Sequence, residues 1–216
     1  MMKNEEIFPH IDHTLLKQVS TWEGIVKLCD QAVQYRTASV CIPPCYIKRV
    51  HQKYGDSLKI CTVIGFPNGY NTTAVKVFEA EQAILDGADE IDMVINITDV
   101  KNGDYTAVEE EIRALRNACK GKILKVIVET CFLTEEEKVA MCMAVTNAGA
   151  DYIKTSTGFG GAGATREDIR LFKEHIGSKV KMKAAGGVKT KEDIEDFLAL
   201  GCDRIGTSSA IDLLTK

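Results

Sequence analysis

The sequence predicts an α/β protein whose eight parallel strands close into a (β/α)8 barrel, as one domain over residues 1–216. Short β-rich runs alternate with amphipathic helical stretches, for example at 72–87 and 134–149. The same passage from helix through glycine to strand recurs in DGADEI, NAGADYI and ALGCDRI, which indicates a repeated β/α unit. Ionisable residues also recur in mid-strand. This polarity favours a barrel with a charged lumen over an open sheet that helices cover on both faces.

Eight segments have the length and composition of buried strands. In several of them a charged residue stands between apolar neighbours, as at Asp92 in IDM and Lys183 in MKA. Because side chains alternate across a strand, one face is apolar and the other carries charge. The predicted strands are residues 10–14, 37–42, 58–65, 90–96, 122–130, 151–157, 179–186 and 202–209.

Helix starts are predicted where a hydroxyl side chain is followed three residues later by an acid, as in a capping box. Helix ends are predicted at three glycines, Gly87, Gly149 and Gly201, which can adopt the left-handed conformation that closes a helix. The predicted N-caps and their acids are Ser20 with Glu23, Thr134 with Glu137, Thr165 with Asp168 and Thr190 with Asp193.

The composition is that of an ordinary globular protein and excludes several functional classes. Hydrophobic residues make up 45% and charged residues 27%, and the net charge of −4 offers no polyanion-binding face for nucleic acid. No apolar run approaches the ~18 residues of a membrane span, and the N-terminal segment lacks the apolar stretch of a signal peptide. The eight cysteines form no C-x-x-C pair and no zinc pattern with histidine. We therefore expect reduced thiols, a cytoplasmic location and no bound metal.

Two lysines lie at the ends of two predicted strands, Lys154 in DYIKTSTGFG and Lys183 in VKMKAAGGVKT. The carboxyl ends of barrel strands face the active site. A lysine among apolar residues loses its proton more readily because burial disfavours the ammonium form, and a second ammonium nearby adds repulsion. The pattern predicts a lysine nucleophile that attacks a carbonyl near neutral pH, with a strand-end lysine that extends to solvent as the alternative.

Asp92 is predicted to serve as a counter-ion for one lysine and to carry protons at a carbonyl or hydroxyl group. Asp12 in IDHT is a second candidate for an inward carboxylate. The adjacent His13 is expected to make structural hydrogen bonds rather than to act as a base. Cys41 is expected to form a pocket wall rather than a reactive thiol.

Glycine-rich segments after the predicted strands suit a phosphate, because their backbone N–H groups are accessible. GFGGAG at 158–163 matches the dinucleotide pattern G-x-G-x-x-G, but the next strand ends without the ribose-binding acid. We interpret it as a flexible loop beside a phosphate. Loops after the seventh and eighth strands commonly bind phosphate in barrels, so Gly186, Gly187, Ser208 and Ser209 are predicted ligands, with plain turn and cap roles as the alternative.

These residues leave three functions open. The first is a Schiff-base enzyme that acts on a phosphorylated carbonyl compound. The second is a phosphosugar isomerase on the same fold, which would not need two lysines in the lumen. The third is a phosphosugar-binding protein without catalysis, which would not need a deprotonated lysine.

Eight segments, in order along the chain, resemble the deoxyribose-phosphate aldolases: IDHTLLK, SVCIPP, VIGFPNG, EIDMVIN, LKVIVET, YIKTSTGF, VKMKAAGGVKT and RIGTSS. The resemblance covers nearly every predicted strand. It implies a (β/α)8 barrel and a class I aldolase without metal or other cofactor. Such an enzyme reversibly cleaves 2-deoxy-D-ribose 5-phosphate into acetaldehyde and D-glyceraldehyde 3-phosphate. A homodimer is expected at the level of the family.

By motif, the resemblance implies that the lysine of KTSTG, Lys154, forms the Schiff base. The lysine of KAAGG, Lys183, would favour the neutral form of that amine, and the aspartate of EIDMV, Asp92, would take part in a proton relay. The implied substrate-binding residues are Asp12, Thr14, Cys41, Thr157, Gly158, Gly186, Gly187, Gly206, Ser208 and Ser209.

Two positions depart from some relatives. Phe159 stands where they have a lysine that helps to bind phosphate, and the sequence ends at Lys216 without their terminal tyrosine. Since no arginine lies in the phosphate loops, we expect neutral donors only. Neutral donors bind an anion less strongly than a charged group does. We therefore expect a weak preference for the phosphorylated sugar, which Phe159→Lys would strengthen.

Overall fold

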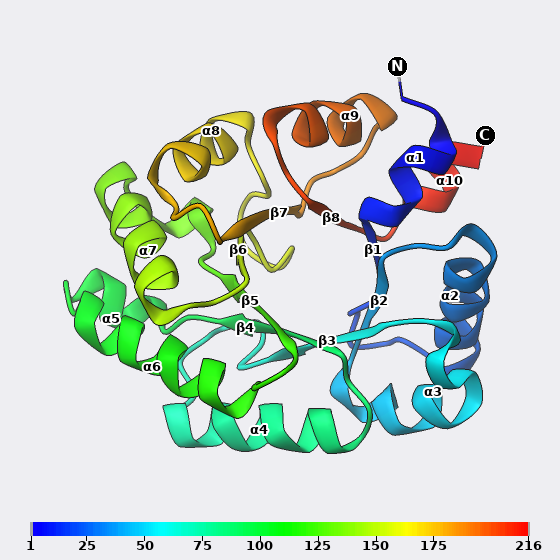
Figure 1. Ribbon diagram of the computed structural model, residues 1–216, viewed down its shortest axis with the longest axis horizontal. Coiled ribbons are helices and arrows are strands. Elements are labelled where there is room, and N and C mark those ends of the chain that lie inside the picture. The colour runs from blue at the N-terminus through cyan, green and yellow to red at the C-terminus, as the bar shows by residue number, and fades with distance from the viewer. Residues whose placement is uncertain (1, 216) are drawn as a thin grey trace.

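Eight parallel strands close into a barrel in the computed structural model, which describes residues 2–215. Each strand pairs with the next and β8 pairs with β1, so the predicted (β/α)8 fold is confirmed. In Figure 1 the helices surround the ring of strands, and α1 lies beside α10 near both ends of the chain. The strands are β1 Ile11–Thr14, β2 Ser39–Ile42, β3 Ile60–Ile64, β4 Glu90–Val94, β5 Ile123–Ile127, β6 Tyr152–Lys154, β7 Lys181–Ala185 and β8 Arg204–Thr207.

Helices connect the strands, and four short 3-10 turns, at Phe8–His10, Pro44–Tyr46, Gly55–Ser57 and Thr130–Phe132, add to the connections. None of the helices in the described part of the chain combines the length and the apolar character that crossing a membrane requires. The helices are α1 Asn4–Ile7, α2 Trp22–Tyr35, α3 Ile47–Tyr54, α4 Thr73–Leu85, α5 Ile97–Lys101, α6 Tyr105–Ala118, α7 Glu135–Ala148, α8 Arg166–His175, α9 Lys191–Leu200 and α10 Ala210–Thr215.

Three of the four predicted N-caps are confirmed. The side chains of Thr134, Thr165 and Thr190 each accept a hydrogen bond from the backbone N–H three residues on. The prediction of Ser20 is wrong, because Thr21 caps α2 by accepting from Gly24. The Ser20 hydroxyl donates instead to the carbonyl of Lys17 and closes a turn before the helix. The acid at Glu23 favoured Ser20 in the sequence pattern, but the helix begins one residue later than that pattern implies, at Trp22.

All eight predicted strands exist, but the paired strands are shorter than the predicted segments. The β6 prediction, for example, runs to residue 157, whereas the strand ends at Lys154. Thr157 turns away and donates its backbone N–H to Glu129 at 3.2 Å. The residues that follow the strands therefore belong to the loops at the carboxyl end of the barrel.

The strand side chains divide between an apolar shell and a polar lumen. Ile153, Met182 and Ala184 are buried in the core cluster between the strands and the helices. Lys125 and Lys183, by contrast, are fully buried among polar groups in the lumen. The alternation predicted from the sequence is thus confirmed, and it gathers the charged side chains on the barrel axis.

Candidate active site

Lys154 and Lys183 are register partners on β6 and β7, and their side chains meet in the lumen. Both Nζ atoms converge on one atom, Oδ2 of Asp92 on β4, at 2.7 Å and 2.8 Å. All three side chains are buried. The structure therefore brings together the three residues for which the sequence predicts chemistry.

Lys183 is firmly held as an ammonium. Its Nζ lies 2.5 Å from Oδ2 of Asp12 in addition to its contact with Asp92. Burial by itself lowers the pKa of Lys183, but these two carboxylates raise it well above the usual value. Lys183 is therefore a fixed positive charge beside Lys154 at neutral pH.

A second layer of charge lies beneath the two lysines. Lys125 Nζ on β5 lies 2.8 Å from Oδ1 of Asp92 and 2.6 Å from Oε2 of Glu90. Arg204 on β8 donates to both oxygens of Glu90, at 3.1 Å and 3.0 Å, and to Oδ1 of Asp12 at 2.5 Å. Each aspartate thus has its Oδ1 held from below and its Oδ2 turned toward the upper lysines. This layer fixes the orientation of both carboxylates.

Both aspartates are ionised at neutral pH. Burial raises the pKa of Asp92, but the surrounding lysines hold it well below its usual range. The same balance, with Arg204 added to the cations, lowers the pKa of Asp12.

The charges of the lumen do not cancel when every group is ionised. Its four cations are Lys125, Lys154, Lys183 and Arg204, and its three carboxylates are Asp12, Glu90 and Asp92. Lys154 contacts Asp92 alone, whereas Lys125 and Lys183 each contact at least two carboxylates. Lys154 therefore has the fewest carboxylate partners of the three lumen lysines.

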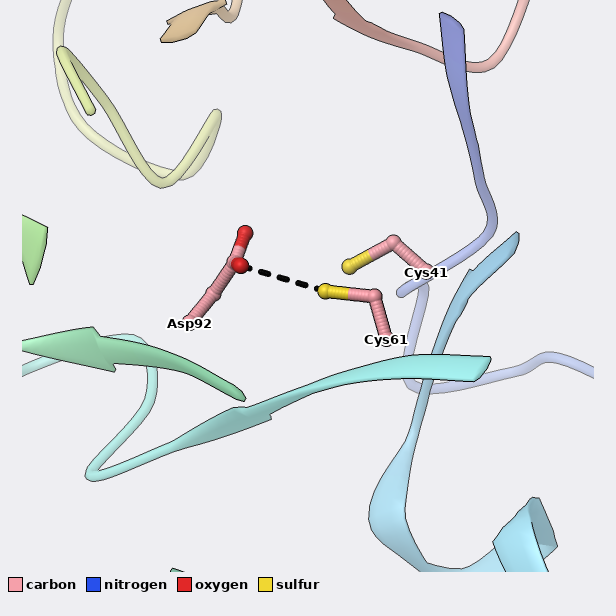
Figure 2. Close-up of side chains that lie close together, drawn as sticks. All are labelled: Cys41, Cys61 and Asp92. Atoms are coloured by element: carbon pink, nitrogen blue, oxygen red, sulfur yellow. Dashed lines mark hydrogen bonds between the residues drawn. The ribbon is translucent and has the colours of Figure 1, made fainter. Parts of the chain in front are cut away.

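Two thiols extend the lumen on the side of β2 and β3 (Figure 2). Cys41 and Cys61 are register partners, and Cys61 Sγ donates to Oδ1 of Asp92 at 3.1 Å. Ligand atoms of these three residues lie within 4.8 Å of one another, which is close enough for a metal ion. However, Lys125 Nζ lies 3.2 Å from Cys61 Sγ, and burial raises the pKa of the Cys61 thiol. A protonated thiol beside an ammonium favours a hydrogen-bonded cluster over a cation site.

A pocket of about 350 Å³ lies over the lysines at the carboxyl ends of the strands. Its size falls in the range of small-ligand pockets. Phe159 forms part of the wall and contacts the ring of Phe66 edge to face, with 5.2 Å between the centroids. The lining residues are Thr14, Leu15, Leu16, Lys17, Lys154, Thr157, Gly158, Phe159, Ala185, Gly186, Gly187, Val188, Gly206, Thr207 and Ser208.

Most of the predicted substrate-binding residues line this pocket, and three do not. Asp12 and Cys41 are fully buried outside its lining, among the lumen residues. Ser209 donates its backbone N–H to the Thr207 hydroxyl at 3.1 Å and stays out of the lining as well. His13 Nε2 lies 3.0 Å from Gln31 Oε1, in line with the structural role expected of it. The predicted residues that do line the pocket are Thr14, Thr157, Gly158, Gly186, Gly187, Gly206 and Ser208.

The loop from Thr157 to Gly163 is tied to its surroundings. The buried carboxylate of Glu129 accepts hydrogen bonds from the backbone N–H and the hydroxyl of Thr157. A Cβ at Gly163 would lie 2.2 Å from the carbonyl oxygen of Gly186, so glycine allows the two loops to pack closely. Among the glycines of GFGGAG, Gly158 is the one in the pocket lining, and α8 begins beyond the motif. The loop is therefore a pocket wall and not a dinucleotide cradle.

The sequence analysis left several residues of this site without a role. Lys125 carried a signal, because it alternates with apolar neighbours in KILKVIVET. Glu90 and Arg204 stand at the starts of their strands, where a charged residue is usually exposed. Lys17 follows two leucines in a loop, and a lysine in a loop does not by itself indicate a function.

The comparisons with known proteins identify related sequences along almost the whole chain. The family of DeoC/LacD aldolases matches residues 7–207. A deoxyribose-phosphate aldolase from Clostridium botulinum (strain Alaska E43 / Type E3) is 65% identical over 213 residues, which are 99% of this chain and 96% of the relative. A second protein of that name, from Clostridioides difficile (strain 630), is 56% identical over 210 residues, which are 97% and 96% of the two chains.

A solved structure agrees with these sequence relatives. The deoxyribose phosphate aldolase from Aeropyrum pernix, which is described as a tetramer, superimposes with a TM-score of 0.89. It is 28% identical, and the match covers 99% of this chain and 91% of that one. The barrel and its connections are thus shared well beyond the close bacterial relatives.

Proposed function

The chain belongs to the DeoC/LacD family of aldolases, and we propose that it reversibly cleaves 2-deoxy-D-ribose 5-phosphate into acetaldehyde and D-glyceraldehyde 3-phosphate as a class I enzyme. The observation that carries the proposal is the meeting of Lys154 and Lys183 on one oxygen of Asp92, at the floor of a pocket of suitable size. A neutral amine in such a pocket is the nucleophile that a Schiff-base aldolase requires.

Lys154 is the nucleophile in this proposal. It lines the pocket, while Lys183 and Lys125 are fully buried and remain paired with carboxylates. Its neutral Nζ attacks the C1 aldehyde of the open-chain sugar and forms a carbinolamine. Loss of water then leaves an iminium, which withdraws electrons from the adjacent carbon chain.

The bond that breaks joins C2 to C3, because acetaldehyde keeps two carbons. A base removes the proton of the C3 hydroxyl, whose electrons form the new carbonyl of glyceraldehyde 3-phosphate. The electrons of the C2–C3 bond pass to the iminium and give an enamine. The enamine then takes a proton at C2, and hydrolysis releases acetaldehyde and the free amine. The iminium accepts the electrons, so the step itself requires no metal and no redox cofactor.

The proton transfers are assigned to Asp92 and Lys183, acting through a water. Asp92 Oδ2 lies 2.7 Å from the Lys154 nitrogen, so the carboxylate is next to the atoms that exchange protons during the reaction. Lys183 and Lys125 hold the carboxylate from two sides, at 2.8 Å each. A fixed cation at Lys183 also disfavours a second ammonium beside it, which favours the neutral amine.

The other two readings account for less of this geometry. A phosphosugar isomerase would use the pocket but would leave a buried lysine pair without a task. A binding protein would need the pocket walls but not three carboxylates that hold cations in fixed positions below them. The relatives named deoxyribose-phosphate aldolase favour the aldolase among the three.

The compartment and the assembly are part of the same proposal. None of the eight cysteines, all of them among the described residues, is in a disulfide, which supports a reducing cytoplasm. A homodimer stays a prediction, and a relative from Aeropyrum pernix is described as a tetramer.

The proposal is tested by product analysis. Purified protein is incubated with 2-deoxyribose 5-phosphate, and both products are identified by chromatography, with acetaldehyde and glyceraldehyde 3-phosphate offered together for the reverse reaction. We expect equal amounts of the two aldehydes and resynthesis of the sugar phosphate. An isomerised pentose phosphate without acetaldehyde, or binding of the sugar without any conversion, would contradict the aldolase.

A further inference from the structure

The pocket has an unusual balance of charge in its lining. Two of its lining residues, Lys17 and Lys154, are ionisable cations, and none of them is a carboxylate. When Lys154 is bound to the substrate carbon as an iminium, Lys17 can still interact with another part of the ligand. A lining of this kind selects an anionic ligand.

Hydrogen bonds to its backbone carbonyl fix the position of Lys17 in the chain. It lies in the loop that follows β1, and its carbonyl accepts hydrogen bonds from the backbone N–H and the hydroxyl of Ser20. Its side chain is exposed, and no carboxylate of residues 2–215 lies within ion-pairing distance of its ammonium group. The ammonium is therefore available to a ligand in the pocket.

Other residues of the lining offer neutral donors. The backbone N–H groups of Gly186, Gly187 and Ser208 donate to no acceptor within residues 2–215. Gly186 and Gly187 have φ angles of +78° and +73°, a conformation that side chains rarely adopt. Successive N–H groups in such a turn form a concave site for an anion.

We propose that Lys17 is the specificity-determining cation of this pocket and pairs with the phosphate of the substrate, opposite the N–H groups of Gly186, Gly187 and Ser208. This inference rests on the proposed function, since it concerns the end of the sugar that Lys154 does not bind. It differs from the expectation that the phosphate meets neutral donors only. That expectation considered the loops after the sixth, seventh and eighth strands and did not include the loop after the first.

Phe159 has a different part in this arrangement. Its ring packs edge to face on Phe66 and closes the wall of the pocket with apolar surface. A lysine at this position would lose the ring contact and add a further positive charge to the pocket. The preference for the phosphorylated sugar therefore depends on Lys17. We expect Phe159→Lys to increase this preference by less than Lys17→Gln decreases it.

The test compares kcat/KM for 2-deoxyribose 5-phosphate with kcat/KM for unphosphorylated 2-deoxyribose in Lys17→Gln. A hydrogen bond to a charged group contributes enough for a fall of about 10- to 100-fold in the ratio of the two values. The value for the free sugar should stay within about twofold, and Lys17→Arg should keep most of the wild-type ratio. The loss should shrink as salt is added, because salt screens an exposed ion pair.

Lys189→Gln tests the rival cation, because Lys189 is exposed on the loop after β7 and directly follows Val188 of the pocket lining without belonging to the lining itself. We expect it to leave the ratio almost unchanged. An unchanged ratio in Lys17→Gln, or a larger fall in Lys189→Gln, would overturn the inference. An equal fall for both sugars would also overturn it, since that result would mean a structural role. The proposed function fails separately, if the wild-type protein cleaves neither sugar.

Discussion

The protein buries lysines in two regions, and the regions differ in what surrounds the ammonium groups. In the lumen, Lys125, Lys154 and Lys183 share three carboxylates, which come from β1 and β4, below an open pocket. Outside the barrel, Lys76 on α4 is fully buried against Glu111 on α6, with 2.8 Å between Nζ and Oε1. Burial of a lysine is therefore no mark of catalysis by itself. The contact with a pocket and the number of carboxylates separate the two regions.

The pKa values of the buried lysines are shifted in opposite directions in the two regions. Burial lowers the pKa of Lys76 and raises that of Glu111, because each has the other as its main charged partner. In the lumen the several carboxylates more than offset burial and raise the pKa of Lys183 and Lys125. Lys76 also donates to the carbonyl of Val94 at 2.9 Å, and its stem lies where a Cβ on Gly65 would meet it at 2.8 Å. The outer pair thus holds the loops after β3 and β4 in place.

Lys154→Arg gives the largest expected effect. Arginine keeps a positive charge beside Asp92 but cannot form an iminium, so cleavage should fall by about 10⁴-fold or more. Steady-state cleavage of 2-deoxyribose 5-phosphate measures the loss, and circular dichroism shows whether the fold is retained. Activity within tenfold of wild type in a folded variant would mean that another residue is the nucleophile.

Lys76→Met sharpens the comparison from the other side. It leaves the Glu111 carboxylate buried without its cation, which should lower the free energy of unfolding by about 3–5 kcal/mol. Urea unfolding measures this change. The kcat of the folded variant should stay close to wild type, because no step of the reaction involves this pair.

The double variant Lys76→Met/Glu111→Gln is the control for that prediction. Glutamine removes the charge but still offers an oxygen to the backbone N–H of Asn96, which Glu111 accepts at 3.2 Å. Most of the lost stability should return. A folded Lys76→Met protein without turnover would show that the two regions do not divide as described.

Lys183→Leu should lower activity at neutral pH by about 100-fold. The variant removes a cation whose pKa the carboxylates of Asp12 and Asp92 raise, and it leaves the Asp92 carboxylate with one ammonium fewer. The Lys154 ammonium then keeps Asp92 Oδ2 to itself, and the neutral amine forms only at higher pH. The rising limb of the pH–kcat/KM profile should therefore move upward by about one unit or more. Full activity with an unchanged profile would remove this role from Lys183.

Removal of metal ions by a chelator should leave the cleavage rate unchanged, the smallest effect among these predictions. The electron sink of the proposed reaction is the iminium on Lys154, and the Asp92 carboxylate and the Cys61 thiol are engaged by ammonium groups. Cleavage rates before and after prolonged treatment with EDTA measure this. Activity that disappears with EDTA and returns with zinc would place the enzyme in the metal-dependent class.

The sequence predicted the fold because each local pattern agreed with the same architecture. Alternating polarity within the strands, the hydroxyl caps and the glycines at helix ends all depend on neighbouring residues, and neighbours are what a sequence shows directly. The cap of α2 was misassigned by one position, because Glu23 completes the capping-box pattern with Ser20 whereas the neighbouring Thr21 is the cap. The ends of the strands were overextended because the first loop residues continue the β-rich composition.

The site was predicted in part, for a physical reason. Lys154, Lys183 and Asp92 belong to short motifs and lie in mid-strand or at strand ends, so their direction could be inferred. Glu90 and Arg204 lie 114 positions apart, and only the register of β4 and β8 around the barrel brings them together. Lys17 lines the pocket only because the loop after β1 closes the ring next to β8. Contacts of this kind depend on barrel closure and not on local sequence.

Chemical trapping tests the central claim most directly. The protein is incubated with acetaldehyde, reduced with sodium borohydride, digested and mapped by mass spectrometry, with Lys154→Arg treated in parallel. We expect one reduced two-carbon adduct, on Lys154, and none in the variant. An adduct on Lys183 or Lys76, or no adduct in a protein that still cleaves the sugar, would contradict it.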